Sequence, residues 1–245
     1  MAVVGNRHGQ SSARNAALLL GIVLIAIAIA GGAAAQDAPR PEALLEELHV
    51  ASISQVQEQG EIQFTLALSS QKAGGAALRD SIGGQFEIEI GVTDRFQLSV
   101  EGAVLDRSAL AGSSDEIEVG AAYEVFRGST SNLIVAVESR ANHLRETEIR
   151  MISAWRLRRA ELHSGMSLEL EDGKRNVSID VAAIWPWAAW RGTLEVHHDS
   201  AFRGSPSIIP GVAWTRDGLQ LGLGVALSSE SESSGRLMLN TAIEF

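Results

Sequence analysis

The stretch that decides the fold is QFEIEIGVTDRFQLSV, residues 85–100. Apolar and polar side chains alternate on both sides of its central GVTDR, so each half has one apolar face and one polar face. A strand produces such faces because successive side chains point to opposite sides, whereas an α-helix cannot keep one apolar face at a period of two. Thr93 and Asp94 carry side chains that hydrogen-bond the backbone of a turn. The stretch therefore predicts two antiparallel strands joined by a tight turn.

The same alternation continues from Gly60 to the end of the chain, where it forms twelve strand-like runs. Short links follow the even-numbered runs, one of them at Pro186, and mostly longer polar links follow the odd-numbered runs. An even strand count with alternating short and long links is typical of the up-and-down barrels of outer membranes. We therefore expect an all-β, antiparallel barrel of about 12 strands over residues 60–245. The runs lie at 60–71, 82–92, 95–105, 115–126, 132–141, 146–157, 160–170, 175–185, 187–198, 207–215, 219–228 and 236–245.

The segment before the barrel carries the features of an export signal. Arg7 and Arg14 precede an uncharged, apolar run over 16–30, and small residues follow it up to Ala35. This pattern predicts a secretory signal peptide over residues 1–35, cleaved near Ala35. A permanent membrane anchor is the alternative, because the apolar run with its Gly/Ala tail is long enough to span a bilayer. Residues 36–59 then form a periplasmic leader, either flexible or inserted into the barrel.

The composition excludes several classes of protein. The chain has 245 residues, 45% hydrophobic residues, a formal net charge of −10 and no cysteine. Without a thiol there is no disulfide, thiolate metal site or cysteine nucleophile. The acidic balance argues against broad binding of nucleic acid, whose phosphates attract basic surfaces. We expect no metal, cofactor or nucleic-acid partner.

Aromatic residues gather at the ends of the predicted strands that meet the short links. Eight of the twelve aromatic residues in the sequence fall there. Aromatic rings favour the lipid–water interface, which predicts a membrane-interface layer. Ordinary core aromatics of a soluble β protein are the alternative. The eight residues are Phe96, Tyr123, Trp155, Trp185, Trp187, Trp190, Trp214 and Phe245.

Two features resemble known outer-membrane proteins. The chain ends on Phe245 after alternating apolar residues, which resembles the recognition signal of Gram-negative outer-membrane barrels. The hairpin over 85–100 resembles the strand, Gly, aliphatic, Thr, Asp, Arg, strand hairpin of an outer-membrane channel family linked to phenol degradation by a meta-cleavage pathway. The resemblance implies a bacterial outer-membrane location, surrounding lipid, and the barrel-assembly machinery as a partner of the last strand. It implies no catalytic residue.

The polar faces of the predicted strands would line the lumen. Charged side chains are costly against hydrocarbon, so their side of each strand is fixed. Acidic residues outnumber arginines among them, which predicts a cation preference if the lumen is open. A lumen filled by ion pairs and water is the alternative. The predicted lumen residues are Glu87, Glu89, Glu101, Glu116, Glu118, Glu138, Arg140, Glu148, Arg150, Arg156, Glu161, Asp180, Arg191 and Glu195.

The leading functional prediction is a channel-like barrel for passive passage of small solutes. A non-conducting structural or adhesion barrel is the first alternative. The second alternative is a lipid hydrolase at the outer rim, for which the candidate residues are His163, His197, His198, Asp199 and Ser200. These residues form no recognisable nucleophile–base motif, so we predict that the chain is not an enzyme. Adjacent histidines on a strand point to opposite faces and cannot chelate one ion.

Overall fold

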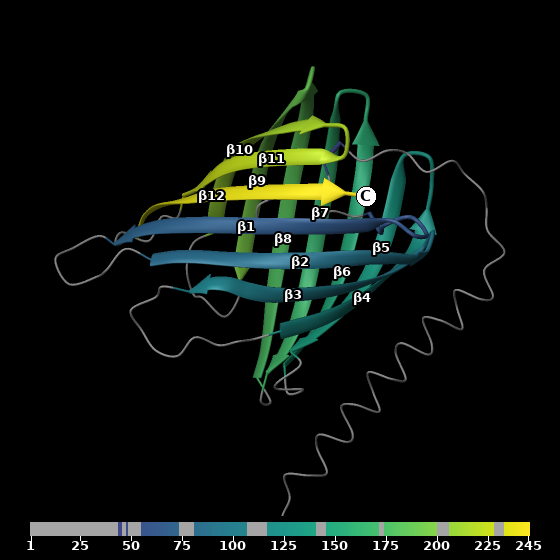
Figure 1. The fold of residues 1–245 in the computed structure, drawn as a ribbon, viewed down its shortest axis with the longest axis horizontal. Helices are drawn as coiled ribbons and strands as arrows, with labels where there is room; N and C mark the ends of the chain where they lie inside the picture. Colours follow the sequence, from purple (N-terminus) through teal and green to yellow (C-terminus); the bar gives the residue numbers. More distant parts are fainter. Residues whose placement is uncertain are drawn as a thin grey trace, which may run out of the picture.

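Twelve antiparallel strands form a closed barrel in the computed structural model (Figure 1). The structure describes residues 44, 45, 48, 55–73, 81–106, 117–140, 146–171, 174–199, 206–227 and 233–245. Each strand pairs with its neighbours along the chain, and β12 pairs with β1. The strands are β1 (Ile62–Ala73), β2 (Ser81–Thr93), β3 (Phe96–Asp106), β4 (Ile117–Arg127), β5 (Ser131–Arg140), β6 (Glu146–Leu157), β7 (Ala160–Glu171), β8 (Lys174–Trp187), β9 (Trp190–Asp199), β10 (Ser207–Arg216), β11 (Leu219–Ala226) and β12 (Ser233–Glu244).

The fold class and the strand count predicted from the alternation are confirmed. Within the described residues, no helix is long and apolar enough to cross a membrane. The predicted signal peptide over 1–35 and its cleavage site lie outside the described residues.

One predicted link is wrong. Pro186 lies inside β8, and the turn to β9 is formed by Ala188 and Ala189, because Trp187 pairs directly with Trp190. Ala188 has a φ of 55°, the left-handed conformation that tight hairpin turns use. The ladder between β7 and β8 stops at Ile184, so a proline placed beyond it removes few hydrogen bonds from the sheet.

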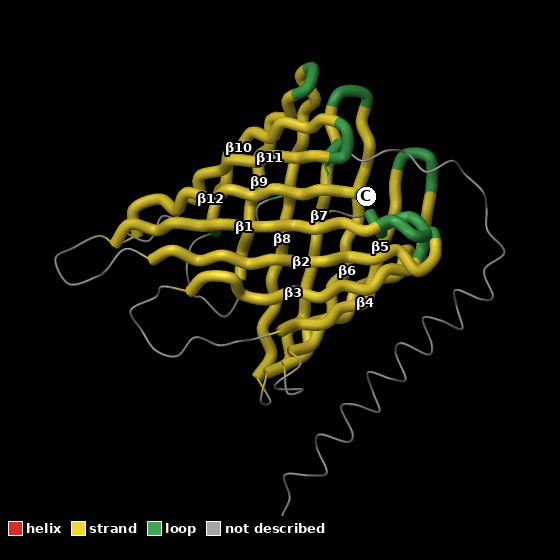
Figure 2. Tube along the Cα trace, viewed as in Figure 1, coloured by secondary structure: helices red, strands yellow, loops and turns green. Residues whose placement is uncertain are grey.

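The turns between strands that the structure describes lie at one end of the barrel, which we call the short-turn end (Figure 2). They span residues 94–95, 128–130, 158–159, 188–189 and 217–218. In the last of these, Asp217 and Gly218 have φ angles of 50° and 73°, as the two-residue Asp-Gly hairpin requires. The first residues of β1 and the last residue of the chain, Phe245, lie at the same end, because Ile62 and Phe245 exchange backbone hydrogen bonds.

The two faces of the wall differ in chemistry. Apolar side chains such as Leu98, Val119 and Leu239 are exposed on the outside, and they alternate along the strands with enclosed polar side chains such as Gln63 and Glu195. In a closed barrel the second set faces the lumen. The apolar outer face is the arrangement that a surrounding bilayer requires.

Candidate functional site: the barrel lumen

Part of the leader lies inside the barrel. Leu45 and Leu48 are buried and pack against Ala182, Ile184 and Ala213 of β8 and β10. The neighbours of these strand residues along the chain, such as Val181, Trp185 and Val212, are exposed on the outer face, so the packed residues face inward. We call Leu44, Leu45, Leu48 and residues 55–60 the inner segment.

A second apolar contact holds the inner segment further along its length. Val56 is 0% exposed and packs against Ile134, Ile152 and Ala122. These strand residues come from β4, β5 and β6, on the inward face that is otherwise polar. The sequence carries a signal for Ile134, because consecutive apolar residues at 133–137 interrupt the period of two. Such an interruption indicates a strand covered on both faces.

Polar contacts fix the same segment to β1, β2 and β3. The backbone N–H of Gln57 donates to Oε1 of Gln97 at 2.8 Å. The side-chain nitrogen of Gln57 donates to Gln63 Oε1 at 2.7 Å and to Glu89 Oε2 at 3.2 Å. Gln97 also donates to Glu89 Oε1 at 2.5 Å. Glu89, predicted as a lumen residue, is therefore part of the network that holds the inner segment.

Gly91 allows the backbone of the inner segment to approach the wall. The N–H of Gly60 donates to the Gly91 carbonyl at 2.9 Å, and the Gly91 N–H donates to the Glu61 carbonyl at 3.0 Å. A Cβ at position 91 would lie 1.8 Å from the Glu58 carbonyl oxygen, so a larger residue does not fit unless the segment moves. Asp94, in the turn after Gly91, accepts a hydrogen bond from the Gln59 N–H at 3.2 Å.

Two further side chains, from β9 and β12, reach the inner segment. Arg191 donates to the Leu44 carbonyl at 3.1 Å, and Asn240 donates to the Leu48 carbonyl at 3.2 Å. Arg191 also donates to the carbonyls of Ala188 and Trp190 at the turn. This predicted lumen arginine thus contacts the inner segment and the wall.

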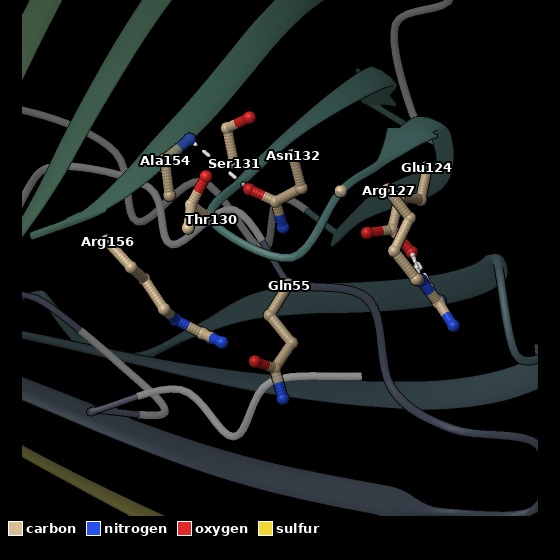
Figure 3. A pocket seen from close by; sticks show the side chains of 9 residues that line it. Gln55, Glu124, Arg127, Thr130, Ser131, Asn132, Ala154 and Arg156 are labelled. Carbon is tan, nitrogen blue, oxygen red and sulfur yellow. Dashed lines mark hydrogen bonds and ion pairs between the residues drawn. The ribbon is translucent and has the colours of Figure 1, made fainter. Parts of the chain in front are cut away.

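A small cavity lies at the short-turn end. A cavity of about 20 Å³ lies between the inner segment and β4–β6, which is room for about one water molecule. Figure 3 shows Gln55 between Arg156 on one side and the Glu124–Arg127 pair on the other. Nε of Arg127 donates to Glu124 Oε2 at 2.6 Å.

Acidic side chains form a row across three neighbouring strands. Glu87 of β2 pairs in register with Glu101 of β3, which pairs with Glu118 of β4. The row continues to Arg140 of β5, whose Nε lies 2.8 Å from Glu118 Oε1. Arg140 also contacts Glu146. The predicted lumen residue Glu116 lies outside the described residues.

The other predicted lumen charges form ion pairs along the wall. Arg150 lies 3.1 Å from Glu138 of β5 and 3.2 Å from Glu148, two residues before it on β6. Arg156 lies 3.3 Å from Glu161. Asp180 contacts Nδ1 of His197 at 2.5 Å. Glu195 is 0% exposed and faces the lumen. Their role as the lining of a solute path stays a prediction.

The candidate hydrolase histidines, which the structure describes, are not brought together. His163 is buried in the lumen beside Glu161 at 2.9 Å, and His197 contacts Asp180. His198 pairs with Ile179, which is exposed on the outer face, so it points away from His197. Ser200 is outside the described residues. No group of three His, Asp or Glu side chains that could hold a metal ion occurs among the residues described.

Three tryptophans form a row on the outer face at the short-turn end. Trp187 pairs with Trp190, and Trp190 pairs with Trp214. Trp155, Trp185 and Phe245 are also exposed at this end. Phe96 and Tyr123 differ, because they lie opposite each other across β3 and β4 and are both buried. The interface role of the eight aromatics stays a prediction.

A larger cavity of about 240 Å³ remains beside β1, β2 and β12. Most of its described lining side chains are on the inward face, and among these the only charged one is an arginine. Asn240, which holds Leu48, also lines this cavity, so the cavity begins where the contact with the inner segment ends. The inward-facing lining is Ala67, Ser69, Gly83, Gln85, Ala103, Arg236, Met238 and Asn240.

Solved structures similar to this fold include outer-membrane porins and a channel. The KdgM porin is 11% identical, with a TM-score of 0.52, over 74% of this chain and 99% of that chain. The COG4313 outer membrane channel from Pseudomonas putida F1 is 13% identical, with a TM-score of 0.52, over 78% and 97%. The NanC porin is 8% identical, with a TM-score of 0.51, over 73% and 98%. No family model and no curated protein matches the sequence. The likeness to outer-membrane channel barrels is confirmed at the level of the fold.

Proposed function

We propose that this chain is an outer-membrane channel for small solutes whose own inner segment narrows the lumen at the short-turn end. The observation that carries the proposal is the lumen itself, in which a cavity of about 240 Å³ adjoins a segment held by specific contacts. A purely structural barrel has no need of such a space. The shared fold supports the proposal, because KdgM and NanC are porins and the Pseudomonas putida protein is a channel.

A cation preference is the finer part of the proposal. Glu87, Glu101 and Glu118 stand side by side across three strands. Like charges opposite each other repel, and a passing cation relieves that repulsion. We therefore expect K⁺ to pass more readily than Cl⁻.

The location follows from the same features. We place the barrel in a bacterial outer membrane, with lipid around its apolar outer face and the short-turn end toward the periplasm. The barrel-assembly machinery is the proposed partner of β12, which is followed by the exposed terminal Phe245.

A non-conducting barrel is the second candidate, and the contacts of the inner segment favour it. Both apolar clusters and the Gln57 network hold that segment in the lumen. If the segment never leaves, the barrel conducts nothing and acts through its outer surface.

Planar-bilayer conductance separates the two candidates. The Gly91→Ala variant removes the space that Glu58 needs, so we expect a larger current than for the wild-type barrel. Gly192→Ala is the matched control, because its Cβ meets Trp185 at an ordinary 3.7 Å. Heat-modifiable gel mobility verifies that each variant is folded.

Two results would contradict the proposal. A folded Gly91→Ala barrel without current would favour the non-conducting barrel. A reversal potential in a KCl gradient that indicates anion preference would remove the cation part alone.

A further inference from the structure

Among the residues that the structure describes, the larger lumen cavity is lined by one charged side chain and otherwise by neutral ones. Arg236 of β12 lines it together with Ser69, Gln85 and Asn240, which carry uncharged hydrogen-bonding groups, and Met238, which is apolar. The acidic row begins further along the wall: Glu87 and Glu101 are each two residues beyond the lining residues Gln85 and Ala103 on β2 and β3.

Arg236 differs from three other arginines in the lumen. Arg140, Arg150 and Arg156 each contact a carboxylate. Arg236 donates from Nη2 to the neutral Ser69 Oγ at 2.5 Å, and within the described part of the chain it contacts no carboxylate. A guanidinium has five N–H donors in a planar fork, so this one contact with Ser69 leaves most of them available.

The surrounding residues keep the guanidinium accessible from the cavity. Gly83 lies beside it, and a Cβ there would be 4.0 Å from Arg236 Nη2 and 3.3 Å from Ser69 Oγ. The absence of a side chain at position 83 therefore leaves space next to the guanidinium. Ser69 holds one Nη at the wall, which orients the fork.

We propose that Arg236 anchors a subsite for small monocarboxylate solutes in this cavity. The planar fork of a guanidinium matches the two oxygens of a carboxylate, which gives a stronger and more specific contact than a point charge. One guanidinium balances one carboxylate, and Met238, Ala67 and Ala103 suit an apolar body on the solute. The inference rests on the proposed channel, because it names a solute that this part of the lumen would bind. The preference for K⁺ over Cl⁻ is a separate property of the acidic row further along the wall.

Equilibrium binding tests the subsite without requiring any current. Saturation-transfer NMR on the full mature chain in nanodiscs measures the Kd for hexanoate and for hexanamide, its uncharged counterpart of similar shape. Empty nanodiscs correct for partition into lipid. We expect hexanamide to bind about tenfold more weakly or worse, because hydrogen bonds to charged groups are the strong ones.

Variants assign the binding to this arginine. In Arg236→Gln we expect the hexanoate Kd to rise to the value that hexanamide has with the wild-type barrel. In Arg236→Lys we expect the hexanoate Kd to rise by less, because a point charge replaces the planar guanidinium. Arg216→Gln is the control, since Arg216 lies on the exposed 216–218 turn next to Asp217. Its hexanoate Kd should stay at the wild-type value.

Three outcomes would overturn the subsite: no wild-type binding of hexanoate, equal binding of hexanoate and hexanamide, or unchanged hexanoate binding in folded Arg236→Gln. None of them depends on conductance. A barrel that binds hexanoate and passes no current would instead retain the subsite and contradict the channel.

Discussion

The side-chain nitrogen of Asn240 donates a hydrogen bond to the backbone carbonyl of Leu48 at 3.2 Å, which joins the last strand to a segment 192 residues earlier in the chain. The same side chain lines the larger lumen cavity. Its Oδ1 atom lies against Gly222 of β11, where a Cβ would be only 1.8 Å away. Asn240 therefore marks the boundary between the part of the lumen that the inner segment occupies and the part that is open.

Substitution of Gly222 should release Leu48. In Gly222→Ala the new methyl group collides with Asn240, so the side chain must move and its bond to Leu48 is lost. We expect faster maleimide labelling of a Leu48→Cys variant in this background. The natural chain has no cysteine, so the label reports position 48 alone.

Leu48→Cys combined with Gly192→Ala is the control for this experiment. Position 192 accepts a Cβ at ordinary contact distance, so the labelling rate should equal that of Leu48→Cys alone. Equal rates for all three proteins would show that Asn240 does not hold Leu48.

Truncation of Val56 should weaken the second contact of the inner segment. Val56→Ala removes two methyl groups from a fully buried site beside Ile134 and Ile152. We expect docking of the segment to weaken by about 1–2 kcal/mol. Hydrogen exchange of the Gln57 and Gly60 amides measures this, because both donate hydrogen bonds to the wall.

Val125→Ala serves as the comparison, because Val125 is 50% exposed on the barrel surface. Its substitution should leave the protection of both amides unchanged. If Val56→Ala also leaves them unchanged, the apolar contact does not stabilise the docked segment.

Removal of Arg150 should destabilise the lumen wall. Glu138 and Glu148 are opposite each other in the sheet, and Arg150 lies within 3.2 Å of both. In Arg150→Gln the two carboxylates repel each other, and we expect a loss of about 1–3 kcal/mol because the three side chains are only partly buried. The urea midpoint in detergent micelles measures the loss.

The double variant Arg150→Gln, Glu148→Gln should recover part of that stability. It removes one of the two repelling charges while the side-chain shapes stay similar. A single variant as stable as the wild-type barrel would mean that solvent in the lumen screens these charges completely.

Trp187 should lie at the lipid–water interface. It is 79% exposed at the short-turn end, next to Trp190 in the row of tryptophans. In a variant whose other four tryptophans are phenylalanine, we expect lipids brominated near the headgroup to quench its fluorescence more than lipids brominated near the chain end. Stronger quenching from the chain end would place this end of the barrel inside the hydrocarbon.

The barrel is determined by local sequence. Each strand carries its own alternation over about ten residues, so the strand positions and the apolar outer face follow from short stretches such as 85–100. The turn at 217–218 is equally local, because Asp-Gly favours the required φ angles. Pro186 was misassigned because a proline signals a turn, and only the pairing of Trp187 with Trp190 places that turn two residues later.

The interior is decided by the tertiary structure. The alternation predicts that Glu89 and Arg191 face inward. It does not predict that they contact the leader, because those contacts join residues far apart in the chain. The partners of Arg150 likewise depend on the register between strands. A strand can shift by any even number of residues and keep its side chains on the same faces, so the alternation does not determine that register. The sequence by itself thus determined a barrel with a polar lumen. How much of that lumen stays open depends on closure of the barrel around the inner segment. It is a matter of volumes and of contacts between residues far apart in the chain, which no local pattern contains.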